Sequence, residues 1–175
     1  MGIERSNRPI AARRISAAAR RLLEASPLCA IATVAPAGQA HVNTAYFAWS
    51  PELDLVWLSE PSATHSRNVR ANGSAAIAVY ESGQTWGRGD RGIQVFGTAS
   101  ELERGAAASA EVLYAARFPE YSAAELAAYR FYLLRPERVK LFDEHEFGAG
   151  VFVTARSAED RRFRWEGTEI YRAGR

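Results

Sequence analysis

The sequence predicts a mainly β (α+β) fold, a closed barrel of about six to eight mostly antiparallel strands with flanking helices. The first observation is a series of short apolar or alternating segments separated by turn residues, beginning at residues 28–34, 40–49 and 53–59. The second is a helical spacing of apolar residues over 7–25 and a helical composition over 106–130. Closure is expected because it removes the strand edges that an open sheet would expose.

The composition is that of an ordinary globular protein. With 47% hydrophobic and 24% charged residues, general disorder is excluded, and 175 residues are enough for one domain with its own core. The single cysteine cannot form an internal disulfide, which favours a reducing, cytoplasmic location. No apolar run reaches the roughly 18 residues of a membrane span. The net charge of +2 does not indicate nucleic acid as a partner.

The first helix is expected to be amphipathic and basic. Its apolar face is formed by Ile15, Ala18, Ala19, Leu22 and Leu23. Its arginines are Arg13, Arg14, Arg20 and Arg21. We interpret these arginines as a solvated face rather than as a contact for nucleic acid or membrane. Residues 1–25 are therefore assigned to an N-terminal basic helix that packs on a single barrel domain spanning residues 26–175.

The strands are expected in a fixed order along the chain. The segments 28–34, 40–49 and 53–59 form an antiparallel meander joined by turns at Ala35–Gln39 and Ser50–Glu52. Cys29 lies in the first of these strands and is interpreted as a small buried hydrophobic residue. Later strands are predicted at 75–80, 93–102, 130–142, 151–155 and 163–165. A polar helix is predicted over 62–72, and Pro119 is expected to divide 106–130 into two helices.

The strong signatures of metal and nucleophile chemistry are missing from the sequence. It has no Cys-x-x-Cys pair, no His-Glu-x-x-His and no Gly-x-Ser-x-Gly elbow. Asp143-Glu-His-Glu146 is interpreted as a polar turn rather than as a metal site, because adjacent side chains diverge. Gly87–Gly92 lacks the lysine and the following helix of a phosphate loop. No metal is expected, and no catalytic residue is assigned.

The polar helix is the strongest candidate for a binding site. If Ser62 caps it, the amides of its first turn point outward at the positive end of the helix dipole, where a phosphate binds well. Thr64 and Ser66 add hydroxyl groups, and His65 and Arg67 add charge or further donors. The third strand brings Trp57, Leu58 and Ser59 to the same place. Asn43 and Thr44 offer hydrogen bonds to a flat ring attached to the phosphate.

Four stretches in this order resemble the pyridoxamine 5′-phosphate oxidase-like family of flavin-binding split β-barrels. They are Gly38–Phe47, Val56–Ser59, His65–Asn72 and Arg91–Ala99. The resemblance implies a homodimer with a flavin mononucleotide (FMN) in each of two interface clefts. It assigns to the cofactor His41, Val42, Asn43, Thr44, Trp57, Leu58, Ser59, Thr64, His65, Ser66, Arg67 and Gln94.

The sequence also departs from pyridoxamine-phosphate oxidases proper. An arginine and a lysine of their second strand are replaced by His41 and Tyr46, and a basic pair at the phosphate turn by Thr64 and His65. Their arginine-bearing C-terminal motif is not recognisable in Gly167–Arg175. The resemblance therefore implies the fold and a flavin-like ligand, but not the vitamin-specific activity.

The predicted function is an FMN-dependent oxidoreductase acting on a small-molecule substrate. One alternative is a reductase that uses a deazaflavin on the same barrel. Another is a non-enzymatic protein that stores flavin or binds haem, with His41 and His65 as candidate axial ligands. A third is an adaptor that uses the arginines of the first helix.

Overall fold

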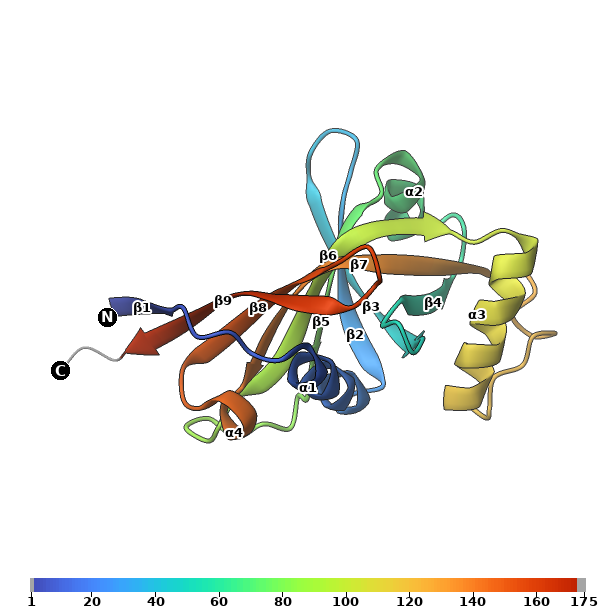
Figure 1. Cartoon of the computed structure of the whole chain (residues 1–175). Coiled ribbons are helices and arrows are strands. Elements are labelled where there is room, and N and C mark those ends of the chain that lie inside the picture. The colour runs from blue at the N-terminus through green and yellow to red at the C-terminus, as the bar shows by residue number, and fades with distance from the viewer. Residues whose placement is uncertain (1, 173–175) are drawn as a thin grey trace. The chain divides into compact units, whose positions relative to one another are not determined.

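The computed structural model of the chain describes residues 2–172, which group into two compact units. The barrel unit comprises Pro27–Ile77 and Phe96–Pro136, and the terminal unit comprises the described residues before 27, Ala78–Val95 and those from Glu137 on. Figure 1 shows the elements. The helices are α1 (Ala12–Glu24), α2 (Thr64–Ala71), α3 (Arg104–Arg117) and α4 (Glu144–Phe147). The strands are β1 (Gly2–Ser6), β2 (Leu28–Val34), β3 (Ala40–Trp49), β4 (Leu55–Ser59), β5 (Ser74–Tyr80), β6 (Arg91–Glu101), β7 (Arg130–Asp143), β8 (Val151–Ser157) and β9 (Phe163–Arg172).

Six strands close a barrel in the order β7-β4-β3-β2-β5-β6, with β6 pairing back to β7. The predicted meander is present, since β2 pairs antiparallel with β3 and β3 pairs antiparallel with β4. Alternate residues of β2 are buried, which is the pattern of a strand with one face on a core. Phe47, Trp57 and Tyr132 are among the largest fully buried side chains. The predicted fold class is confirmed.

The terminal unit is built on the strand order β1-β9-β8-β7, all antiparallel. Helix α1 packs against β9 through the predicted apolar face, which is buried from Ile15 to Leu23. On its other side, Arg14 and Arg21 both donate to the Glu146 carboxylate of α4. Part of the basic face predicted to be solvated is therefore occupied by internal ion pairs.

Several element boundaries differ from the sequence prediction. The strand Gly2–Ser6 was not expected, and Asp143–Glu146 is not a turn but the cap and start of the short helix α4. The segment 106–130 holds one helix instead of two, because α3 ends at Arg117 and the following residues form turns. Phe118, with φ −123° and ψ 87°, lies outside the helical region, which a residue before proline avoids. Within the described residues, no helix has both the length and the apolar character that a membrane span requires.

Candidate functional site

Helix α2 is fixed to the barrel by buried hydrogen bonds. The Asn68 amide donates to the Thr33 hydroxyl of β2 at 3.1 Å, and both side chains are buried. Ser66, which is fully buried, donates to the Ser59 hydroxyl of β4 at 3.3 Å. Val69 adds an apolar contact area on the same face of α2. These bonds set the orientation of α2 relative to β2 and β4.

The start of α2 differs from the prediction in its cap. Ala63, not Ser62, is the capping residue, and no side chain caps the helix. The Ser62 hydroxyl donates to the Glu60 carboxylate instead, because a charged acceptor lies two residues away and forms the stronger bond. The amides of the first turn therefore have no side-chain cap, which leaves the positive end of the α2 dipole open to an anion.

A guanidinium group lies beside this open helix end. Arg67 turns back toward the N-terminus, donating to the Ser62 carbonyl and, at 3.3 Å, to the Thr64 hydroxyl. Thr64 and Arg67 are both exposed. The structure thus brings a hydroxyl, a guanidinium and a helix N-terminus together, and this donor set fits a phosphate group.

His65, which was expected to add charge or a further donor, is held beside the same turn. Its Nε2 atom and the Ser59 hydroxyl are 2.7 Å apart, and its ring stacks with that of His41 at a centroid distance of 6.4 Å. Burial, and to a lesser degree the neighbouring His41, lowers the pKa of His65 below its ordinary value of 6.5. The ring is therefore neutral at pH 7, and His65 can offer a hydrogen bond but no charge.

A second polar cluster, which the sequence analysis did not identify, lies at the other end of α2. Arg70 donates to Glu101 at 2.9 Å and to the Tyr132 hydroxyl at 3.2 Å, and Tyr132 donates to Glu101 at 3.0 Å. Arg70 also donates to the Pro61 carbonyl at 2.7 Å. Burial raises the pKa of Tyr132, so the phenol stays protonated and keeps its hydrogen for Glu101. Arg70 is thus occupied within the barrel unit.

The four consecutive residues predicted on β3 divide between two faces of the strand. His41 and Asn43 pair across the sheet with Thr33 and Ile31, whose side chains are buried. Val42 and Thr44 point to the other face and are exposed. Successive side chains of a strand alternate, so one ligand cannot contact all four side chains. It could reach the others only through the backbone.

The side-chain amide of Asn43 makes only part of its possible hydrogen bonds. Its Nδ2 donates to the Thr44 carbonyl at 3.3 Å, while its Oδ1 is buried and has no hydrogen-bond partner among the described residues. An unpaired buried acceptor costs free energy that a donor from a ligand would recover. A flavin ring carries both donors and acceptors, so the Asn43 amide fits such a ligand.

The remaining predicted residues lie at different depths. Trp57 is fully buried against Tyr132, with ring centroids 5.7 Å apart, and its Nε1 has no partner within the described part of the chain. Leu58 is partly buried and Ser59 is buried. Gln94 is exposed on β6 and belongs to the terminal unit. Residues 2–172 contain no cluster of three or more metal-ligating side chains.

Three of the solved structures that share this fold illustrate its range. A protein of unknown function from Agrobacterium tumefaciens matches with a TM-score of 0.64 and 22% identity, over 73% of this chain and 55% of its own. The chain thus spans about half the length of that protein. The heme storage protein HutZ from Vibrio cholerae matches with a TM-score of 0.60 and 22% identity, over 67% of this chain and 87% of its own.

The third structure is a pyridoxamine 5′-phosphate oxidase-related, FMN-binding protein from Nostoc punctiforme. It matches with a TM-score of 0.61 and 15% identity, over 92% of this chain and 94% of its own. Comparison with the curated proteins finds no similar sequence. The sequence profile described as pyridoxamine 5′-phosphate oxidase matches residues 15–143, which include every strand of the barrel. The chain therefore belongs to the pyridoxamine 5′-phosphate oxidase family.

Proposed function

We propose that the chain binds FMN at the start of α2 and acts as an oxidoreductase on a small molecule. The observation that carries the proposal is the uncapped α2 N-terminus with Thr64 and Arg67 beside it, a donor set suited to a phosphate. The FMN-binding protein from Nostoc punctiforme, which shares the fold, supports the choice of ligand.

When bound, FMN would supply the redox chemistry. The chain's own residues would bind and orient it. Thr64 and Arg67 would hold the phosphate, and the Asn43 amide would offer a hydrogen bond to the ring. His65, neutral and held by Ser59, would contribute a hydrogen bond without adding charge. No side chain is assigned to acid or base catalysis.

The visible spectrum of the freshly purified protein is the first test. Two flavin bands support the proposal, whereas a single band at shorter wavelength would indicate the deazaflavin. A Soret band would indicate haem, the candidate favoured by the parallel rings of His41 and His65 and by the fold shared with HutZ. If His65 were to bind haem iron through Nε2, its hydrogen bond with the Ser59 hydroxyl would have to break. Otherwise another ring nitrogen would have to bind the iron.

Replacement of Thr64, His65 and Arg67 together by alanine tests the phosphate position. Hydrogen bonds to a charged group are each worth about 1.5–3 kcal/mol, so FMN affinity should fall by roughly two to four powers of ten. The affinity for riboflavin, which lacks the phosphate, should fall much less. Isothermal titration of the apo variant with both ligands measures the difference.

A matched control is Arg104→Ala, which removes an exposed arginine at the start of α3 in the same unit. It should bind both ligands as the unaltered protein does. Equal losses of affinity for FMN and for riboflavin in the triple variant would mean that the phosphate binds elsewhere.

We also propose that two copies associate through the outer face of the β2–β3 hairpin. Leu28, Val42 and Tyr46 are 42%, 63% and 54% exposed on this face. Leu28 pairs with Tyr46, and Val42 pairs with Ala32, so these apolar residues lie in one stripe, which Thr44 interrupts between Val42 and Tyr46. A second copy would cover the same stripe with its own, as a two-fold interface requires. Such an apolar stripe is costly to leave in water.

Val42→Asp would place a charge on each side of this interface. Two uncompensated aspartates, desolvated and of like sign, should weaken the dimer by at least about 100-fold. Sedimentation velocity at micromolar concentration should show a dimer for the unaltered protein and a monomer for the variant. Val112→Asp, at an exposed valine of α3, is the control and should stay dimeric. A monodisperse monomer for the unaltered protein would contradict the proposal.

A further inference from the structure

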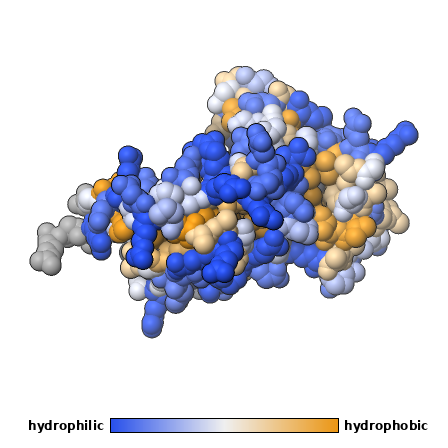
Figure 2. Space-filling model, viewed as in Figure 1, coloured by the Kyte–Doolittle hydropathy of each residue, from blue (hydrophilic) through white to orange (hydrophobic). Residues whose placement is uncertain are grey.

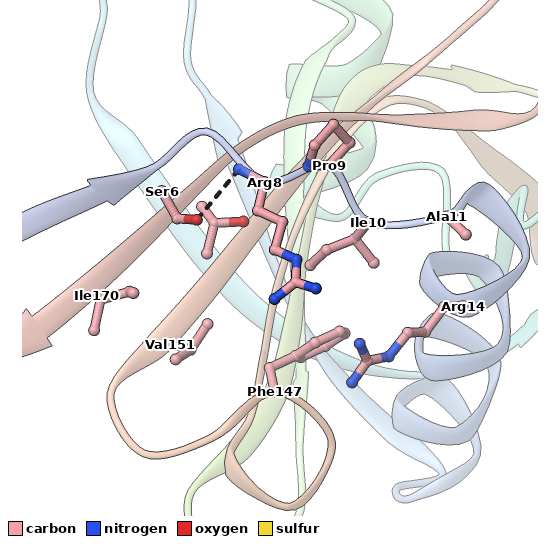
Figure 3. Close-up of a pocket in the computed structure, with 10 residues that line it drawn as sticks. Ser6, Arg8, Pro9, Ile10, Ala11, Arg14, Phe147, Val151 and Ile170 are labelled. Carbon is pink, nitrogen blue, oxygen red and sulfur yellow. Dashed lines mark hydrogen bonds between the residues drawn. The ribbon is translucent and has the colours of Figure 1, made fainter.

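A groove of about 660 Å³ lies within the terminal unit, apart from the proposed flavin site. Its walls are the segment between β1 and α1, the first turn of α1, the end of α4, and strands β8 and β9. Figure 3 shows side chains from these elements converging on it. The volume is in the range of small-molecule sites.

The charge of the groove has one sign. Arg8 and Arg14 line it, and none of its lining residues is acidic. Within residues 2–172 the Arg8 guanidinium has no hydrogen bond or ion pair; only its backbone amide is bonded, to Ser6. Arg14 is held by Glu146 and lies 5.4 Å from the Phe147 ring centroid. Glu146 also binds Arg21, so this carboxylate does not neutralise the groove.

The rest of the groove is largely apolar. Ile10, Phe147, Val151 and Ile170 line it, and none of them is fully buried. Figure 3 shows the guanidinium of Arg8 reaching into the space between Val151 and Phe147. A free guanidinium thus stands against an apolar wall, which is an arrangement complementary to a molecule with an anionic head and an apolar body.

We infer that this groove binds a small carboxylic acid with an apolar tail. The Arg8 guanidinium offers two parallel N–H donors to the carboxylate, a geometry that favours this head group. The tail covers Val151, Ile170 and Phe147 and removes their apolar surface from water. The inference does not depend on the flavin proposal, because none of the groove residues belongs to the barrel unit.

Titration of the purified full-length protein with octanoate, 1-octanol and inorganic phosphate tests both parts of the inference. Octanoate should bind at least about tenfold more tightly than either, because each of the others lacks one of the two contacts. In the series acetate, butyrate and octanoate, affinity should rise about two- to fourfold per methylene group. Calorimetry or ligand-observed NMR provides the readout.

Variants locate the site. Arg8→Gln should weaken octanoate binding about tenfold or more, because a charge-assisted bond is lost, and Arg8→Lys should restore part of it. Arg13→Gln is the matched control, since Arg13 is exposed on α1 but does not line the groove. Circular dichroism checks that each variant is folded.

Four results would overturn the inference: no octanoate binding, equal affinity for phosphate, equal affinity for 1-octanol, or the same loss in Arg13→Gln as in Arg8→Gln.

Discussion

Two helices, α2 and α3, pack on the barrel unit by different means. Helix α3 is held by aromatic packing, in which the Tyr114 ring lies 4.8 Å from that of Phe118 and 5.7 Å from that of Phe131, centroid to centroid. Helix α2 buries a single apolar side chain larger than alanine, Val69, and is otherwise fixed by hydrogen bonds from Ser66 and Asn68. Figure 2 shows hydrophobic residues gathered over the region of α3.

The difference has a physical meaning. The hydrophobic effect is non-directional, so α3 is stabilised mainly by the apolar area that its rings bury. Buried hydrogen bonds are directional and costly to leave unmade, so they fix α2 in one orientation. A helix that must present its first turn to a ligand needs such a fixed orientation. The comparison therefore predicts that α3 contributes more to stability and that α2, if it holds the phosphate as proposed, contributes to positioning.

The largest expected effect comes from breaking the α3 side. Tyr114→Ala removes a ring that is 8% exposed and central to the aromatic cluster, and should lower the free energy of unfolding by about 3 kcal/mol. Urea denaturation measures the change. Val112→Ala on the same helix, at a valine that is 70% exposed, should cost less than about 0.5 kcal/mol. An equal cost for the two variants would mean that the cluster does not hold α3.

A smaller effect is expected on the α2 side. Asn68→Leu keeps the shape of the side chain but leaves the Thr33 hydroxyl buried without its partner, which should cost about 1–3 kcal/mol. The double variant with Thr33→Val removes both polar groups and should recover much of the loss. FMN affinity should fall in Asn68→Leu if α2 positions the phosphate. Additive costs in the double variant would show that the bond itself is not the cause.

The same two regions show what the sequence could predict. The helical composition of 106–130 predicts α3 correctly, although only Ala110 and Tyr114 of this helix are buried, whereas the turns after Pro119 depend on packing that no local pattern shows. A helix was predicted over 62–72 and is present at Thr64–Ala71, but its cap was not predicted, because Glu60 competes for the Ser62 hydroxyl. The division of His41 to Thr44 between two faces follows from strand alternation alone and could have been predicted.

The contacts between distant elements were beyond the reach of sequence patterns. Glu101 meets Arg70 across 31 positions, and Tyr132 meets Arg70 across 62. Neither residue belongs to a recognisable motif, and only the closure of β6 on β7 brings them together. The strand pattern and the family resemblance both predicted the barrel, but neither could predict these side-chain partners.

The smallest expected effect concerns the two histidines beside α2. The pKa of His65 is lowered by burial first and by His41 second, so His41→Gln should raise it toward 6.5 without reaching that value. An NMR titration of the His65 ring protons measures the shift. His145→Gln, on α4 in the terminal unit, is the control and should leave the titration of His65 unchanged.

The lowered pKa of His65 also determines how the stability of the protein changes with pH. The unfolded chain binds the His65 proton more tightly than the folded chain, so unfolding takes up a proton between the two pKa values. Stability is therefore full above pH 6.5 and is lost as the pH falls from 6.5 through the lower pKa of the folded state. His41→Gln should narrow the pH range over which this stability is lost, and His65→Gln should abolish the contribution of His65 to the loss. Urea denaturation across that pH range measures both effects. If the unaltered protein and His65→Gln lose the same amount of stability as the pH falls, another group takes up the proton. His65 is then held less firmly in the folded protein than its 2.7 Å contact with Ser59 indicates.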